Sequence, residues 1–318
     1  MSFKIIGTGS YLPSRVVSND ELSQFLDTSD EWISQRVGIS ERRVCTTETT
    51  SDLAYEAANA ALEMSGISTK ELDMIICATV SADFAAPSLA CTVQSMTGAS
   101  CPAMDINAAC SGFIYALETA AGYFARGLNR ILVIGAERLS KILDWEDRST
   151  AVIFGDGAGA MVLEKGDGYI ASKLYAKGNS AVLSIPNHIG HSPYFEREIP
   201  APYIYMNGQE TFKFAVNAMC ADLVDVVKAA GLEMDDISWI IPHQANARII
   251  DTSAKRLGVS LDRCLKNIEK TGNTSAASIP ILYDELHRSG KLNDGDYIAM
   301  SSFGAGVTSA ACVIKHTI

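Results

Sequence analysis

The sequence predicts an α/β fold made of two related halves, residues 1–165 and 166–318. Two observations predict it: short apolar, β-branched segments alternate with helical patterns along the chain, and the second half repeats features of the first. Such alternation is typical of buried, largely parallel strands with helices on the sheet faces. No Gly/Ser-rich or charged linker separates the halves, so we expect them to pack together.

Strands are expected where short apolar runs stand between polar segments. These runs cover residues 3–9, 73–80, 130–137, 151–154, 160–165, 239–243, 296–303 and 310–315. Helices are expected at 51–66 and 211–231, because their apolar residues recur about every 3.6 positions and each segment ends in Gly, a common helix terminator.

An internal repeat relates the halves. The segment GISTKELDMII (66–76) aligns with GLEMDDISWII (231–241) at an offset of 165 residues, since each ends a helix with Gly, crosses an acidic loop and enters an apolar strand. At nearly the same offset, Asn107 corresponds to Asn273, so NAACSGF and NTSAASI occupy matching places. This self-similarity predicts that the halves face each other.

The composition excludes several classes of function. The formal net charge is -11, whereas general nucleic-acid binding needs a basic surface. The eight cysteines form no C-x-x-C pair, so we expect no zinc ribbon, thioredoxin-type site or other metal site. We find no signal peptide pattern and no apolar run of about 20 residues. A cytoplasmic protein with reduced thiols and no membrane contact is therefore expected.

The most informative segment is MDINAACSGFIYALET (104–119), which contains Cys110. A strand-like approach, small neighbours and a following helical pattern place Cys110 at a tight strand-to-helix turn. The unpaired N–H groups and the dipole at a helix N-terminus favour an anion, so we expect a lowered thiol pKa and a nucleophile. The alternative is a buried, inert cysteine, which is our interpretation of the other seven.

The second half supplies two possible partners for this thiol. His243 directly follows an apolar strand, and Asn273 lies where the repeat pairs it with the cysteine loop. If the halves face each other, Cys110, His243 and Asn273 converge on one pocket. The structural alternatives are a helix N-cap for Asn273 and a satisfied structural histidine for His243. The shared geometry favours the functional interpretation.

Six motifs resemble those of the β-ketoacyl-acyl-carrier-protein synthase III family of thiolase-like condensing enzymes, in the same order. They are DEWISQRVGISERR (30–43), NAACSGF (107–113), IFGDGAGA (153–160), PHQANARII (242–250), GNTSAAS (272–278) and FGAG (303–306). The resemblance covers essentially the whole chain. It implies a layered α-β-α-β-α architecture of two βαβαβ halves, a homodimer, and the initiating condensing enzyme of type II fatty acid synthesis.

The resemblance also implies catalytic roles. Cys110 would be acylated by acyl-CoA, which is a substrate, and no cofactor is implied. His243 and Asn273 would hydrogen-bond the thioester oxygen of malonyl-acyl carrier protein while decarboxylation generates a carbanion. That carbanion would attack the acyl-cysteine and give 3-oxoacyl-acyl carrier protein. The backbone N–H groups of Cys110 and Ala305 would form the oxyanion hole.

Binding roles follow from the same resemblance. Trp32 would stack on the CoA adenine, with Arg36 and Arg148 beside it. The carrier protein would contact a basic surface formed by Lys213, Gln244, Ala245, Asn246, Ala247, Arg248, Lys255 and Arg256. Such a surface would steer an acidic carrier protein. The alternatives are solvated salt bridges for the arginines and a solvated helix face with an Asp251–Lys255 pair.

Three positions depart from the family pattern. Val37 stands where Thr is frequent, Ser309 stands where Trp is frequent, and Phe84 falls away from the expected aromatic wall of the acyl pocket.

Two further sequence patterns do not predict a functional site. GDGAG (155–159) lacks the full nucleotide-loop spacing, so we expect a tight turn where backbone approaches backbone. The pair formed by His188 and His191 lacks a third metal ligand.

Other functions remain open at this point. A thiolase-like starter synthase or acyltransferase of a polyketide or secondary pathway would keep Cys110 and use another donor or acceptor. A papain-type Cys-His-Asn hydrolase would commonly be secreted with disulfides, which this chain does not indicate. A non-catalytic CoA- or acyl-binding protein would use Cys110 structurally. The acyl chain length depends on side chains that meet only in three dimensions.

Overall fold

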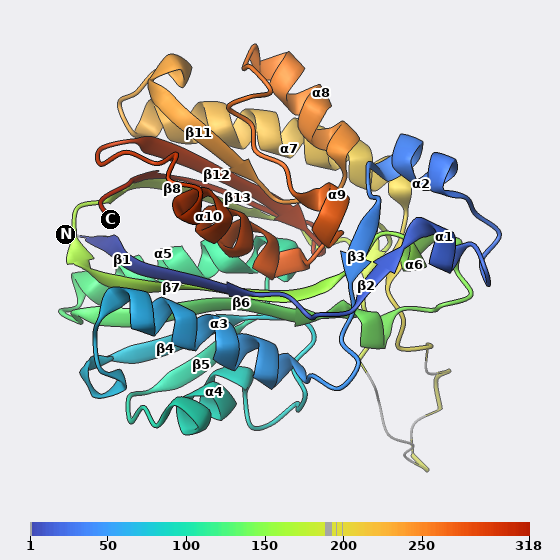
Figure 1. The fold of residues 1–318 in the computed structure, drawn as a ribbon, viewed down its shortest axis with the longest axis horizontal. Coiled ribbons are helices and arrows are strands. Elements are labelled where there is room, and N and C mark those ends of the chain that lie inside the picture. The colour runs from blue at the N-terminus through green and yellow to red at the C-terminus, as the bar shows by residue number, and fades with distance from the viewer. Residues whose placement is uncertain (1, 188–192, 195, 199) are drawn as a thin grey trace.

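The computed structural model describes residues 2–187, 193–194, 196–198 and 200–318, and the pair His188 and His191 lies outside the described residues. Two β-sheets are stacked with helices between and outside them, in five layers (Figure 1). The α/β class and the layered architecture are therefore confirmed. In this described part, no helix has the length and apolar character needed to cross a membrane.

The first sheet has the strand order β1-β7-β6-β4-β5. Its strands are β1 Ser2–Tyr11, β4 Met74–Ala78, β5 Ala103–Ile106, β6 Arg130–Arg138 and β7 Asp156–Gly166. β4 runs parallel to β5 and β6, whereas β7 runs antiparallel to β1 and β6. β4 is buried at every position, as expected of a parallel strand covered on both faces.

The second sheet has the strand order β11-β12-β13-β8. Its strands are β8 Tyr169–Ala176, β11 Ile237–Pro242, β12 Tyr297–Gly304 and β13 Thr308–Lys315. β11 runs parallel to β12, and β13 runs antiparallel to β12 and β8. The strands of the two sheets thus lie within 2–166 and 169–315. The domain boundary at residue 165 stays a prediction.

Two helices, α5 (Gly112–Ala125) and α10 (Ser278–Arg288), form the layer between the sheets (Figure 1). Their apolar side chains share one core with residues of both sheets. The outer layers contain α3 Thr50–Ser65, α4 Leu89–Thr97, α7 Gly208–Ala229 and α8 Ala247–Leu257. The predicted helices at 51–66 and 211–231 correspond to α3 and α7.

Shorter elements complete the fold. The helices are α1 Asn19–Leu22, α2 Asp30–Val37, α6 Arg148–Ala151 and α9 Ile268–Thr271, and the strands are β2 Val16–Ser18, β3 Glu41–Arg43, β9 Leu183–Ser184 and β10 Tyr205–Met206. Of these, α1, α2, α6, β2 and β3 lie together at the right-hand end of the molecule in Figure 1. The 3-10 turns of the described residues are η1 Thr69–Glu71, η2 Ala109–Ser111, η3 Leu139–Ile142, η4 Met234–Asp236 and η5 Ser275–Ala277.

The internal repeat is present in the backbone. η2 leads directly into α5, and η5 leads directly into α10. Ala109 and Ser275, the first residues of the two turns, both have a φ of 49°, which non-glycine residues rarely adopt. Each half therefore places an equivalent strained turn before its own central helix.

Two predicted elements are wrong. Residues 151–154 form no strand, because Asp147 caps the short helix α6 by accepting a hydrogen bond from the Ser149 N–H at 2.8 Å, and a turn follows. GDGAG is not a turn, since Asp156 begins the long strand β7. The expected close approach of backbone is present nevertheless: a Cβ on Gly159 would lie 2.6 Å from the Ile281 backbone nitrogen. β8 was not predicted.

Candidate active site

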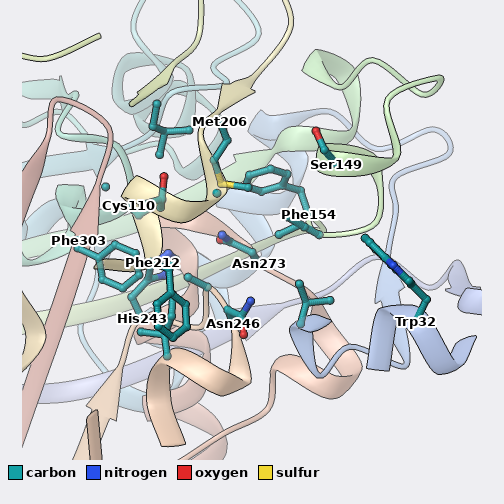
Figure 2. Close-up of a pocket in the computed structure, with 18 residues that line it drawn as sticks. Trp32, Cys110, Ser149, Phe154, Met206, Phe212, His243, Asn246, Asn273 and Phe303 are labelled. Atoms are coloured by element: carbon teal, nitrogen blue, oxygen red, sulfur yellow. The ribbon is translucent and has the colours of Figure 1, made fainter. Parts of the chain in front are cut away.

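A cavity of about 230 Å³ is lined by residues of both halves. Cys110, His243 and Asn273 line it together, so the fold brings the three predicted catalytic residues into one site. Figure 2 shows their side chains grouped on one side of the cavity, with Trp32 on the other. A substrate that enters past Trp32 would reach the thiol.

Cys110 lies in η2, immediately before α5. Its side chain is partly exposed to the cavity. The end of β12 packs tightly on this turn: a Cβ on Gly304 would lie 2.7 Å from the Cys110 nitrogen, so only glycine fits there. This contact fixes the thiol at the junction of the halves.

The expected lowered pKa of Cys110 is wrong for the unliganded protein. Burial raises the pKa of this thiol to about 12; Ser275 opposes the rise and the carboxyl of Glu137 adds to it. Loss of solvation thus outweighs the field of the α5 N-terminus. The free protein holds a neutral thiol at neutral pH.

His243 follows β11 and is 2% exposed. Its backbone N–H donates to the Ser301 carbonyl at 2.7 Å, and its ring lies edge-on to Phe303 with centroids 5.4 Å apart. The ring Nδ1 lies 2.7 Å from the Ser278 hydroxyl, whereas the buried Nε2 has no hydrogen-bond partner among the described residues. Burial lowers the pKa of His243 to about 3, so the imidazole is neutral.

Asn273 is held by hydrogen bonds on both sides of its backbone. Its N–H donates to the Ile153 carbonyl at 2.9 Å, and its carbonyl accepts from the Gly155 N–H at 3.0 Å. Its side-chain Oδ1 accepts from the Ser275 N–H at 2.8 Å. Because the oxygen is engaged, the amide NH₂ group is the part left to act as a donor in the cavity.

Ala305 directly follows β12 at the turn into β13. The Thr308 hydroxyl donates within this region, with distances of 3.1 Å to the Ala305 carbonyl and 3.1 Å to the Ala108 carbonyl. Thr308 thus ties the Ala305 turn to the loop that precedes Cys110. The predicted oxyanion-hole residues, Cys110 and Ala305, lie on these two joined segments.

Trp32 lies at the cavity on α2, between two cations. The guanidinium carbons of Arg36 and Arg148 are 5.8 Å and 5.2 Å from its ring centroid. Arg148 also contacts the backbone carbonyl and carboxylate of Asp27. The structure therefore groups the three predicted CoA-binding residues, although one of them already has an anionic neighbour.

A second hollow, of about 710 Å³, adjoins the cavity. It is lined by three cations, Arg36, Lys213 and Arg248, together with Phe212, over which the Arg248 guanidinium lies at 5.9 Å. Asn246 belongs to both hollows and donates to the Arg36 carbonyl at 3.2 Å, which joins α8 to α2. We call this hollow the basic groove.

Not every predicted carrier-protein residue reaches the basic groove. Gln244 is fully buried, and its amide oxygen accepts from the Asn267 N–H at 3.1 Å, so its side chain cannot touch a partner. Lys255 and Arg256 are exposed but do not line the groove. Ala245 lines the cavity, and Ala247 is packed against Gly38. The alternative Asp251–Lys255 pair is wrong, because Asp251 pairs with Lys266 at 2.6 Å.

Of the three positions that depart from the family pattern, two are buried and one is exposed. Val37 lines the cavity and packs in an apolar cluster, so no polar contact arises there. Ser309 is buried in β13 opposite Phe303. Phe84 is 58% exposed.

Sequence reasoning missed two buried polar residues beside the site. Ser278 contacts the His243 ring through its hydroxyl. Its place in the GNTSAAS motif was the only feature of the sequence that could have indicated this role. Glu137, at the end of β6, accepts hydrogen bonds from the Val80 N–H and from the Ser81 hydroxyl. Burial raises the pKa of Glu137 to about 7. A buried carboxyl at the end of an apolar strand was the available signal.

Known proteins resemble this chain over nearly its whole length. The profile of 3-oxoacyl-[acyl-carrier-protein (ACP)] synthase III matches residues 104–178, and that of its C-terminal region matches 227–316. A β-ketoacyl-[acyl-carrier-protein] synthase III of Clostridium beijerinckii is 48% identical over 320 residues, covering 99% of each chain.

Solved structures of similar proteins cover nearly the same length. The 3-oxoacyl-[acyl-carrier-protein] synthase III of Aquifex aeolicus is 44% identical, with a TM-score of 0.92 and coverage of 99% of this chain and 100% of that one. The priming β-ketosynthase of the R1128 polyketide biosynthetic pathway is 33% identical, with a TM-score of 0.93 and coverage of 99% and 96%.

Proposed function

The chain belongs to the 3-oxoacyl-[acyl-carrier-protein] synthase III family, and we propose that Cys110, His243 and Asn273 perform its chemistry. It is an acyltransferase, the initiating condensing enzyme of fatty acid synthesis. The observation that supports the proposed roles is the shared cavity, which is lined by Cys110, His243 and Asn273.

In the first half-reaction, the Cys110 sulfur attacks the carbonyl carbon of an acyl-CoA. The S–C bond to CoA breaks, and the proton of the thiol ends on the CoA sulfur. The transient oxyanion accepts hydrogen bonds from the backbone N–H groups of Cys110 and Ala305. Because the pKa of Cys110 is raised, the thiol gives up its proton as its sulfur attacks, and the α5 N-terminus lies where it can stabilise the negative charge that forms on the sulfur.

In the second half-reaction, malonyl-acyl carrier protein loses CO₂ and its thioester becomes an enolate. Neutral His243 and the Asn273 amide donate to the enolate oxygen without protonating the carbanion. The carbanion attacks the acyl carbon, the bond to Cys110 breaks, and the sulfur takes a proton from solvent. The product is 3-oxoacyl-acyl carrier protein.

We assign the two substrates to different parts of the entrance. Trp32, Arg36 and Arg148 would hold the CoA nucleotide, and the basic groove with Arg248 and Lys213 would receive the acidic carrier protein. We further propose that the protein is a cytoplasmic homodimer and uses no cofactor besides its acyl-CoA substrate. Sedimentation analysis of the purified chain tests the dimer.

Intact mass spectrometry after incubation with a panel of acyl-CoAs tests the nucleophile. The parent protein should gain one acyl group, and Cys110→Ala should gain none, whereas Cys91→Ala, which removes an exposed cysteine, should be acylated like the parent. Adding malonyl-acyl carrier protein should discharge the acyl group. Acylation without discharge would favour a starter synthase that uses another extender, as in polyketide priming.

A further inference from the structure

Ser278 is a buried hydroxyl that the reaction itself does not touch. It is the first residue of α10 and is 2% exposed. Its oxygen lies 2.7 Å from His243 Nδ1 and accepts a longer hydrogen bond, 3.4 Å, from the Gln244 N–H. A second serine, Ser301, gives a useful comparison. Its carbonyl accepts from the His243 N–H, but its buried hydroxyl has no hydrogen-bond partner among the described residues.

We propose that Ser278 is a positioning residue that fixes the Nε2–H tautomer of His243. A hydroxyl has one proton to donate. The Ser278 oxygen accepts from the Gln244 N–H, and among the described residues His243 Nδ1 is the only acceptor within hydrogen-bond distance of its hydroxyl. Ser278 therefore donates its proton to Nδ1, which is then the bare nitrogen of the neutral ring. The ring proton is left on Nε2, the atom without a protein partner.

This tautomer decides what His243 can do in the cavity. An Nε2–H group donates to an enolate oxygen, whereas a bare Nε2 would repel it. Phe303 packs edge-on against the ring and prevents it from rotating freely. The inference rests on the proposed donor role of His243, and it names the group that enforces that role.

Ser278→Ala is the test, and Ser301→Ala is its matched control, because each removes one buried hydroxyl beside the same histidine. Three quantities are measured in the full-length protein: the tautomer of His243 by ¹³C and ¹⁵N NMR of histidine-labelled protein, acylation of Cys110 by acyl-CoA, and CO₂ release from malonyl-acyl carrier protein. His243→Asn identifies the His243 resonances. Acylation also reports that each variant is folded.

The parent and Ser301→Ala should show the Nε2–H tautomer. Ser278→Ala should shift His243 toward the Nδ1–H form, lose at least tenfold in CO₂ release and stay within about twofold of the parent in acylation. An Nδ1–H parent, an unchanged tautomer in Ser278→Ala, or equal losses in both variants would overturn the inference. A parent that is acylated yet releases no CO₂ would instead count against the proposed function. The tautomer inference would still be tested in that case, because NMR reports the tautomer without turnover.

Discussion

Asn273 combines two separable tasks in one side chain. Its Oδ1 holds the η5 turn by accepting from the Ser275 N–H, and its NH₂ group is the proposed donor to the enolate. Asn273→Asp keeps the acceptor and replaces the donor by a negative oxygen. We expect CO₂ release to fall at least 100-fold, about 2.7 kcal/mol or more, because a carboxylate repels the enolate. Measurement of ¹⁴CO₂ from labelled malonyl-acyl carrier protein checks this.

Acylation of Cys110 and the melting temperature are the controls for Asn273→Asp. Both should remain near the parent values, since the η5 turn keeps its acceptor. Equal loss of acylation and decarboxylation would mean that Asn273 serves the fold of the site and not the enolate.

The burial of Cys110 predicts the pH dependence of its alkylation. A group whose pKa is raised to about 12 is neutral below that pH, so its thiolate fraction grows tenfold with each pH unit. We expect the logarithm of the iodoacetamide rate to rise with slope one from pH 6 to 9. Cys110→Ala supplies the background from exposed Cys91. A plateau near neutral pH would show that the helix N-terminus outweighs burial.

Single residues were the hardest part to predict from the sequence. The pattern around Cys110, His243 and Asn273 was sufficient to expect one pocket, because the repeat placed their loops opposite each other. The direction of the Cys110 pKa shift could not be predicted from the sequence, since it depends on how completely segments distant in the chain exclude water from the thiol. Gln244 looked like a surface residue for a similar reason: its burial depends on Asn267 and Leu265, far along the chain.

At the scale of elements, Gly38 controls how α2 meets α8. Its φ is 75°, and a Cβ there would lie 2.4 Å from the Ala247 Cβ. At Gly66, where φ is 68°, an added Cβ would meet no atom within 4 Å. Gly66→Ala should therefore cost about 1 kcal/mol from backbone strain alone, whereas Gly38→Ala should cost about 1–3 kcal/mol more from overpacking. Urea unfolding of both variants measures the difference.

Gly38→Ala should also disturb function, because α2 carries Trp32 and α8 carries Arg248. We expect higher KM values for both acyl-CoA and malonyl-acyl carrier protein in Gly38→Ala only. Equal stability losses in the two glycine variants would contradict the close packing of α2 on α8.

Elements with a strong local signal in the sequence were predicted well, whatever their length. β4, β6 and α3 carry their signal locally, in apolar runs or helical periodicity. Residues 151–154 have strand-like composition, but the Asp147 cap and the turn before β7 decide their conformation. The glycines of GDGAG suggested a turn, whereas Gly157 and Gly159 are needed where α10 packs on β7 and Gly155 lies against the Thr271 carbonyl. The first error concerns a helix cap a few residues earlier in the chain, and the second a tertiary contact that overrode local preference.

At the scale of the whole molecule, Asp284 links the halves through the central layer. This α10 residue is 1% exposed and accepts from the hydroxyls of Thr8 and Ser10 of β1, each at 2.7 Å, and from Arg288 at 2.9 Å. Asp284→Ala leaves the buried Thr8 hydroxyl and the partly buried Ser10 hydroxyl without their acceptor, so we expect a loss of about 2–4 kcal/mol. Asp235→Ala, at an exposed carboxylate 3.8 Å from Arg263, should change stability by less than about 0.5 kcal/mol.

Equilibrium urea unfolding of both aspartate variants measures these losses. An Asp284→Ala protein as stable as the parent would mean that water replaces the carboxylate, and that the apolar contacts of α5 and α10 alone hold the halves together.

The equal φ of Ala109 and Ser275 has a consequence for the history of the fold. If the halves descend from one ancestral unit that paired with its own copy, that pair held two equivalent strained turns across a twofold axis. Once both copies lay on a single chain, selection could act on each turn separately. One turn would then have come to hold the proposed nucleophile Cys110, and the other to support the proposed donor Asn273. Joining the two copies in one chain would thus let two equivalent turns take different roles. An assembly of identical subunits could not do this, because each change of sequence would appear in every copy.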